Sequence, residues 1–202
     1  MQKPWGKAWC KNLERYSDYS NRVGRGRSYV KNGFIFDLKI FKGKVISLVQ
    51  GTRATPYTCE ISFNLLSKSK WEKIQELTES RFKTLEVLLK GQFPKELQEI
   101  FSEQGTGIFP TPKEIKFDCS CPDWASMCKH IAATLYAIGA KLDKHPELLF
   151  SLRGVNMSEL IGSALEKHKN SLLKTAKNIK SNRVLDVRDS SLGKLFDIEF
   201  NS

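Results

Sequence analysis

Three cysteines and one histidine lie within twelve residues of this 202-residue chain, and this cluster constrains the fold more than any other feature. The segment has the spacing C-x-C-x6-C-x-H and consists of Cys119, Cys121, Cys128 and His130. Three thiolates and one imidazole make a complete tetrahedral ligand set for Zn²⁺. A catalytic zinc normally keeps one coordination position for water, so four protein ligands predict one structural zinc ion.

Other interpretations of the cluster are weaker on chemical grounds. A disulfide between Cys119 and Cys121 would close a small strained ring, and cytosolic proteins rarely keep disulfides. Packing alone does not explain the polar neighbours Ser120, Asp123 and Lys129. An iron–sulfur cluster usually takes four cysteines, and the motifs of zinc deaminases are absent. Composition alone does not exclude a catalytic cysteine nucleophile. Four further residues have no ligand-spaced neighbours and are predicted to be packing or surface residues: Cys10, Cys59, His145 and His168.

Positive charge is concentrated in the N-terminal part of the chain. The net charge is +11, and residues 1–59 contribute +9 of it, with twelve Lys or Arg against three Asp or Glu. Such a segment attracts polyanions, nucleic acid first and anionic membranes second. We expect a glycine-containing loop over 22–27, with Arg22, Arg25 and Arg27 contacting phosphate, and Lys129 as a further contact. Solvated arginines beside a simple turn are the competing interpretation.

Hydrophobic periodicity predicts an α+β fold with a small antiparallel sheet near the N-terminus, a helical middle, a zinc knuckle with its helix, and a C-terminal helix. Trp5 and Trp9 lie on one face of a first helix and are expected to dock it onto the core. The strands are predicted at 28–30, 34–41, 44–49, 57–65 and 114–118. The further helices are predicted as two within 69–91, and at 94–102, 129–142 and 146–154, with a last one after Asn156.

These elements divide the chain into four predicted segments: a basic antiparallel β module at 1–66, a helical connector at 67–112, the zinc finger at 113–154, and an amphipathic helix with a tail at 155–202. The last helix is expected to bury one stripe, made of Leu160, Ala164, Leu165, Leu172, Ala176 and Ile179. No apolar run reaches the roughly 18 residues of a membrane span, and no secretory signal is visible. We therefore expect a cytoplasmic, nucleoid-associated protein without a membrane partner.

The ligand spacing resembles the SWIM-type zinc finger, in which C-x-C-x(n)-C-x-H is followed by a helix rich in small residues, here 131–133. Three further motifs are similar to those of bacterial stand-alone SWIM zinc finger proteins. They are Trp-Gly-Lys-Ala-Trp at 5–9, Arg-Gly-Arg-Ser-Tyr at 25–29 and Cys-Ser-Cys-Pro-Asp-Trp at 119–124. The resemblance covers about residues 5–154. It implies DNA binding or protein–protein contact, beside Swi/Snf-class DNA translocases or Mutator-type transposases.

No Walker A, Rossmann, nucleophile-elbow or metalloprotease motif is present, so we expect a protein that is not an enzyme and has no small-molecule substrate. The sequence thus predicts a structural zinc that supports nucleic-acid binding, with DNA as the expected form, by an accessory to a Swi/Snf-class ATPase. The alternative is a protein–protein adaptor, whose finger and tail (195–200) dock a partner. A metallohydrolase would require an open metal position.

Overall fold

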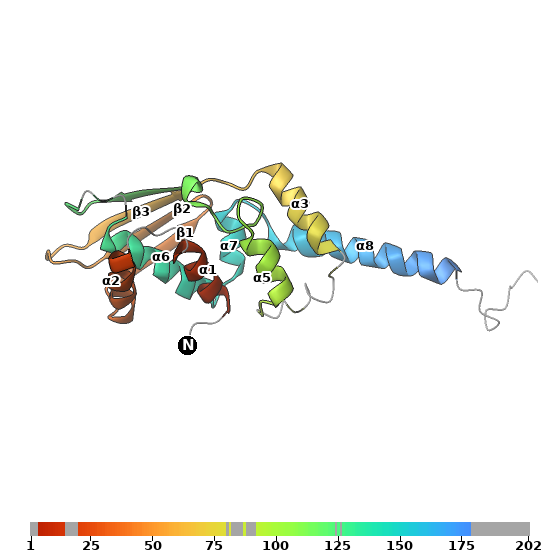
Figure 1. The fold of residues 1–202 in the computed structure, drawn as a ribbon, viewed down its shortest axis with the longest axis horizontal. Coiled ribbons are helices and arrows are strands. Elements are labelled where there is room, and N and C mark those ends of the chain that lie inside the picture. The colour runs from red at the N-terminus through yellow and green to blue at the C-terminus, as the bar shows by residue number, and fades with distance from the viewer. Residues whose placement is uncertain are drawn as a thin grey trace, which may run out of the picture. The chain divides into compact units, whose positions relative to one another are not determined.

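A four-stranded antiparallel sheet is the framework of the N-terminal part of the chain (Figure 1). Its strands, in spatial order, are β1 (Ile35–Phe41), β2 (Lys44–Val49), β3 (Tyr57–Phe63) and β4 (Ile115–Cys119). Helices accompany the sheet, so the predicted α+β class is confirmed. Because β4 pairs with β3, the predicted segments 1–66 and 113–154 contribute to one sheet.

The computed structural model describes residues 4–14, 20–79, 81, 87, 92–123, 125 and 127–178, with the backbone alone at 20–23, 79 and 176–178. Residues 1–165 form one compact unit and residues 166–202 a second. Most of the second predicted helix within 69–91 lies outside the described residues, as does the tail at 195–200.

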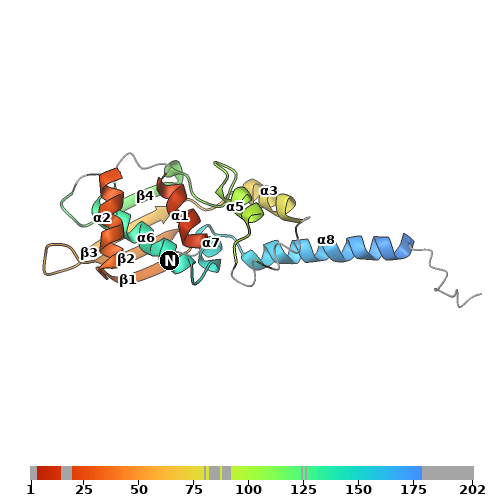
Figure 2. The same ribbon diagram turned by 60° about the horizontal axis from the view of Figure 1, so that its bottom comes forward.

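Helix α6 (Lys129–Leu142) is the central element of the first unit. It contacts all four strands on one side, and α1 (Pro4–Glu14) and α2 (Ser20–Lys31) pack against it, as the two views in Figures 1 and 2 show. Every residue from His130 to Gly139 is buried. A helix enclosed on all sides needs apolar or small residues all round, which explains the composition of this segment.

Helix α2 overturns the prediction of a loop at 22–27 and of a strand at 28–30. Its glycines allow a close approach between helices. A Cβ added to Gly26 would lie only 2.8 Å from both the carbonyl carbon and the Cβ of Ala132. Packing against α6 therefore outweighs the low helix propensity of two glycines, which sequence reasoning took as helix breakers.

The predicted docking of α1 through its two tryptophans is confirmed. Trp5 and Trp9 are 1% and 0% exposed, and the Trp9 indole Nε1 donates a hydrogen bond of 2.8 Å to the Leu135 carbonyl. Between the tryptophans, a Cβ on Gly6 would lie 2.6 Å from the Gly139 carbonyl oxygen. The motif at 5–9 thus combines two aromatic anchors with a glycine at the point of closest contact.

The remaining elements connect or extend this framework. They are α3 (Lys68–Glu79), α5 (Lys95–Ser102), the short 3-10 helix η1 (Pro112–Glu114), α7 (Glu147–Leu152) and α8 (Met157–Asn178). The predicted buried stripe of α8 is only partly correct. Leu160 and Ala164 are buried, whereas Leu165 and Leu172 are exposed. The Ala176 side chain and all of Ile179 lie outside the part of the chain that the structure describes. No described helix is long and apolar enough to cross a membrane.

A buried ion pair fixes the entry to β4. The fully buried Arg153 donates to the Glu114 carboxylate (Nη2 to Oε1, 2.7 Å) and to the Asn64 carbonyl (2.5 Å). Burial raises the pKa of Glu114, but hydrogen bonds from Thr111 and Arg153 outweigh it and lower the pKa to about 2. The carboxylate therefore stays ionised and holds β4, which leads to the cysteine cluster, in place.

The two glycines of α2 provide a matched pair of variants. Gly26→Ala should destabilise the protein by about 1–3 kcal/mol, because the new methyl group overlaps α6. Gly24→Ala, where a Cβ would meet nothing within 4 Å, should stabilise it by up to about 1 kcal/mol through helix propensity. Urea denaturation of both variants measures the difference. Equal effects would contradict the close packing of α2 on α6.

Candidate metal centre

The four predicted ligands meet at one point in the structure. The Sγ atoms of Cys119, Cys121 and Cys128 and a ring nitrogen of His130 all lie within 4.8 Å of one another. The His130 Nδ1 atom is 3.9 Å from Cys119 Sγ and 3.9 Å from Cys128 Sγ. Tetrahedral zinc with its usual bond lengths places sulfur and nitrogen ligands about 3.6–3.8 Å apart, so the donor set fits one zinc ion after small movements.

Strand alternation and a helix cap bring these donors together. Cys119 ends β4, and Ser120 points to the other side, where its Oγ accepts a hydrogen bond from the Thr58 backbone N–H at 3.0 Å. Cys121 thereby returns to the side of Cys119. Cys128 is the N-cap of α6, and its sulfur accepts a hydrogen bond from the backbone N–H of the third helical residue at 3.4 Å. Positive potential at this helix end favours the thiolate form.

Aromatic rings orient the imidazole of His130. The ring packs against Tyr57 (centroids 4.6 Å apart) and edge-on against Tyr29 of α2 (5.7 Å). Nε2 is buried and has no hydrogen-bond partner among the described residues. Gly51 faces this atom, and a Cβ there would lie 3.1 Å from it. The packing therefore leaves Nδ1, which faces the sulfurs, as the coordinating atom.

The thiols need a cation to ionise. A hydrogen bond with Cys119 and burial raise the pKa of Cys128 to about 12, and burial raises the pKa of Cys121. A hydrogen bond with Cys128 lowers the pKa of Cys119, but contact with Cys59 and burial outweigh it and bring this pKa to about 12. Protonated thiols are thus the metal-free state at neutral pH, and metal binding must displace their protons.

Cys59 is a member of the site that sequence reasoning missed. It lies on β3 directly opposite Cys119, and the two sulfurs are 3.5 Å apart. Cys59 is fully buried. When Cys119 is a metal-bound thiolate, the Cys59 S–H becomes the donor of this contact and stabilises the negative sulfur. The sequence signal was the alternation of β3, which places Cys59 on the inner face but does not reveal its partner 60 residues later.

The arginines predicted to contact nucleic acid have different environments. The side chain of Arg22 lies outside the described residues, and Arg25 is exposed on α2. Arg27 forms an ion pair with Glu14 of α1, and its guanidinium lies 5.3 Å from the ring centre of Tyr136. Tyr136 in turn donates to Glu14 at 2.8 Å. Arg27 therefore links α1, α2 and α6, and a nucleic-acid role for the three arginines stays a prediction.

Lys129, the fourth predicted contact, lies beside the metal ligands. Its ammonium group is 5.5 Å from the ring centre of Tyr29, a cation–π arrangement that turns the side chain toward α2. Trp124, which interrupts the knuckle in the sequence, lies outside the described residues.

We predict that the purified protein carries one zinc ion per chain and that Cys121→Ser and His130→Ala each lose it. Because the raised thiol pKa values keep the metal-free cysteines protonated, zinc binding should release about three protons at pH 7, and affinity should rise with pH. Metal analysis and calorimetry in buffers of different ionisation enthalpy measure both quantities. His145→Ala, distant in the sequence and exposed, is the control that should retain zinc. An affinity independent of pH would contradict the ligand set.

The role of Cys59 is tested by three variants. Cys59→Ala should weaken zinc binding about 10–100-fold, since it removes the donor to the Cys119 thiolate. Cys59→Ser retains a donor and should recover most of the affinity. Cys10→Ala removes another buried cysteine and should leave zinc affinity unchanged. Competition with a chromophoric chelator gives the three affinities, and a normal affinity for Cys59→Ala would exclude the proposed donor.

Comparisons with known proteins agree with this geometry. Residues 113–139, which span β4, the knuckle and most of α6, match the family model of the SWIM zinc finger. The chain is 36% identical over 144 residues to the uncharacterized protein Rv2102 of Mycobacterium tuberculosis, an alignment that covers 71% of this chain and 52% of the relative. The chain thus spans about half the length of that relative. No solved structure matches significantly. The family match and the four converging donors together identify residues 113–139 as a SWIM zinc finger with a site for one zinc ion.

Proposed function

We propose that this protein is a non-enzymatic zinc finger protein that binds nucleic acid, with DNA as the expected form. The observation that carries the proposal is the packing of the basic N-terminal helices on the finger helix. Tyr29 of α2 contacts the metal ligand His130, and Gly26 lies against Ala132 of α6. Basic helices and metal centre therefore belong to one packed unit, and the helices lie within residues 1–59, whose net charge is +9.

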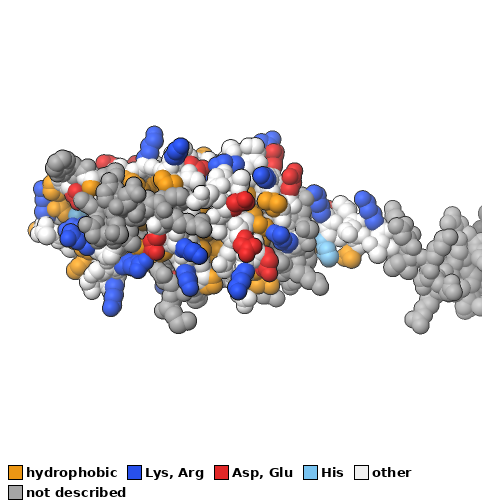
Figure 3. All heavy atoms as spheres, viewed as in Figure 1, with side chains coloured by type: hydrophobic (Ala, Val, Ile, Leu, Met, Phe, Trp, Pro, Cys, Tyr) orange, Lys and Arg blue, Asp and Glu red, His pale blue; other side chains and the backbone are white. Residues whose placement is uncertain are grey.

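In this proposal the metal site acts through position. Its ligands hold the first turn of α6 against the end of β4, and α6 supports α1 and α2. Basic side chains gather over α1 and α2 on the face seen in Figure 3. A rigid array of positive charges binds phosphate better than a flexible one, because less side-chain and backbone entropy is lost on binding.

Two considerations support a binding role over catalysis. Four protein ligands fill a tetrahedral shell and leave no position for a substrate or for water. The large residues of the inner sheet face are buried against α6, so the finger helix fills the space beside the sheet. Association with a Swi/Snf-class ATPase is a further part of the proposal, and it is supported by the family resemblance alone.

A protein–protein adaptor is the second candidate, and the outer face of the sheet favours it. Phe36 and Phe41 on β1 are 61% and 49% exposed, and Leu48 on the neighbouring strand is 36% exposed. Exposed aromatic side chains on one sheet face are typical of protein interfaces.

The test is binding to fluorescent DNA oligonucleotides, duplex and single-stranded, over a series of salt concentrations. The logarithm of the affinity should fall linearly with the logarithm of salt concentration, and Arg25→Ala should reduce the slope by about 0.9 for duplex DNA if it neutralises one phosphate. Lys95→Gln, an exposed lysine on α5, is the control and should leave the slope unchanged.

Removal of zinc separates geometry from charge. The loaded site carries three thiolates, one Zn²⁺ and a neutral imidazole, whereas the metal-free site carries neutral thiols, so chelation makes the protein slightly more positive. Electrostatics alone would then strengthen DNA binding, while loss of the supporting geometry should weaken it.

If the zinc-loaded protein binds neither duplex nor single-stranded DNA at low salt, the adaptor function replaces nucleic-acid binding as the proposed function.

A further inference from the structure

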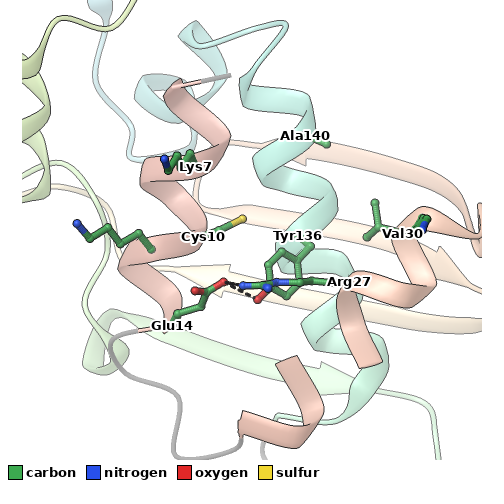
Figure 4. Close-up of a pocket in the computed structure, with 9 residues that line it drawn as sticks. Lys7, Cys10, Glu14, Arg27, Val30, Tyr136 and Ala140 are labelled. Carbon is green, nitrogen blue, oxygen red and sulfur yellow. Dashed lines mark hydrogen bonds and ion pairs between the residues drawn. The ribbon is translucent and has the colours of Figure 1, made fainter. Parts of the chain in front are cut away.

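We propose that the groove between α1 and α2, with α6 as its floor, is the surface that receives the phosphodiester backbone of the nucleic acid (Figure 4). This inference rests on the proposed function and gives it a location. The groove has a volume of about 830 Å³ and is open to solvent. The sequence did not indicate this groove. Of the residues predicted to contact nucleic acid, only Arg27 lines it.

Two pairs of basic residues line the groove, one pair on each helix. Lys7 and Lys11 are four residues apart on α1, and Arg27 and Lys31 are four residues apart on α2. Residues four apart lie about 6 Å apart along a helix and on the same side of it. Each wall therefore carries two basic residues one helical turn apart, an arrangement suited to an extended anion rather than to a single ion.

Among the described residues that line the groove, the one acidic residue does not oppose an anion. Glu14 accepts hydrogen bonds from Arg27 and from the Tyr136 hydroxyl, and Figure 4 shows these three side chains meeting between the helices. Arg27 and Glu14 neutralise each other. Lys7, Lys11 and Lys31 are exposed, and no described carboxylate forms an ion pair with them, so the groove keeps a charge of about +3 for a ligand.

The floor of the groove favours a backbone over a small phosphorylated molecule. Tyr136 and Ala140 of α6 form it, and the Tyr136 hydroxyl already donates to Glu14. Cys10 of α1 and Val30 of α2 border it and add few polar atoms. A small ligand needs several convergent hydrogen-bonding groups to fix its orientation. Rim lysines over an apolar floor instead suit contacts with successive phosphates, which position a polymer without reading its bases.

The experiment compares two triple variants with the same change in net charge. One replaces the groove lysines (K7Q, K11Q and K31Q), and the other replaces exposed lysines of α3, α5 and η1 (K73Q, K95Q and K113Q). Salt-dependent binding is measured with the zinc-loaded full chain and fluorescent duplex and single-stranded DNA. The groove triple should lower the duplex slope by about 2.7 and the affinity by tenfold or more, whereas the control triple should keep the wild-type slope.

The outcomes distinguish this inference from the function on which it rests. If the wild type binds DNA and both triple variants lose the same affinity, the protein binds nucleic acid but the groove is not the binding surface. Net charge alone then determines the affinity. Absence of wild-type binding at low salt overturns both. Inorganic tripolyphosphate is added at constant ionic strength as a third arm. Another outcome is that tripolyphosphate binds at one site in the wild type and at none in the groove triple, while the two proteins bind DNA equally. In that case the groove binds a compact phosphate, and the inference fails. Zinc content and circular dichroism of each triple establish that it is folded.

Discussion

The four donor atoms at the junction of β4 and α6 are the constraint on which the rest of the structure depends. They join the last residue of an edge strand to the first turn of the helix that packs against all four strands of the sheet. With the junction fixed, the direction of α6 across the sheet is fixed as well. The positions of α1 and α2 follow, since both pack against α6. Zinc binding of this kind contributes free energy directly to folding, on the order of 10 kcal/mol in small fingers.

Local sequence patterns predicted the elements that are determined by residues close together in the sequence. The ligand spacing identified the metal site. Composition and turn signals identified β1 and β2 closely, and alternation identified β3. The Pro and Asn signals placed the starts of α5 and α8 within a residue or two. These features depend on neighbours a few positions away, and a single sequence displays such neighbours directly.

The features that sequence reasoning missed depend on partners far along the chain. Gly26 looks like a helix breaker until Ala132, more than a hundred residues later, is placed against it. Cys59 looks like an ordinary buried residue until strand register sets it opposite Cys119. Arg27 shows no local sign of its ion pair with Glu14, which lies thirteen residues earlier on another helix. In each case tertiary packing decides the role, and residue type alone is consistent with more than one.

The order of the strands has a consequence for synthesis on the ribosome. The first three strands form a meander of neighbours in the sequence, whereas β4 begins more than fifty residues after β3 ends, and α6 follows it. The meander can therefore pair early, but its apolar inner face stays open to solvent until the chain has grown past residue 142. Late closure of this kind slows folding and leaves a growing chain prone to aggregation while its apolar surface is exposed.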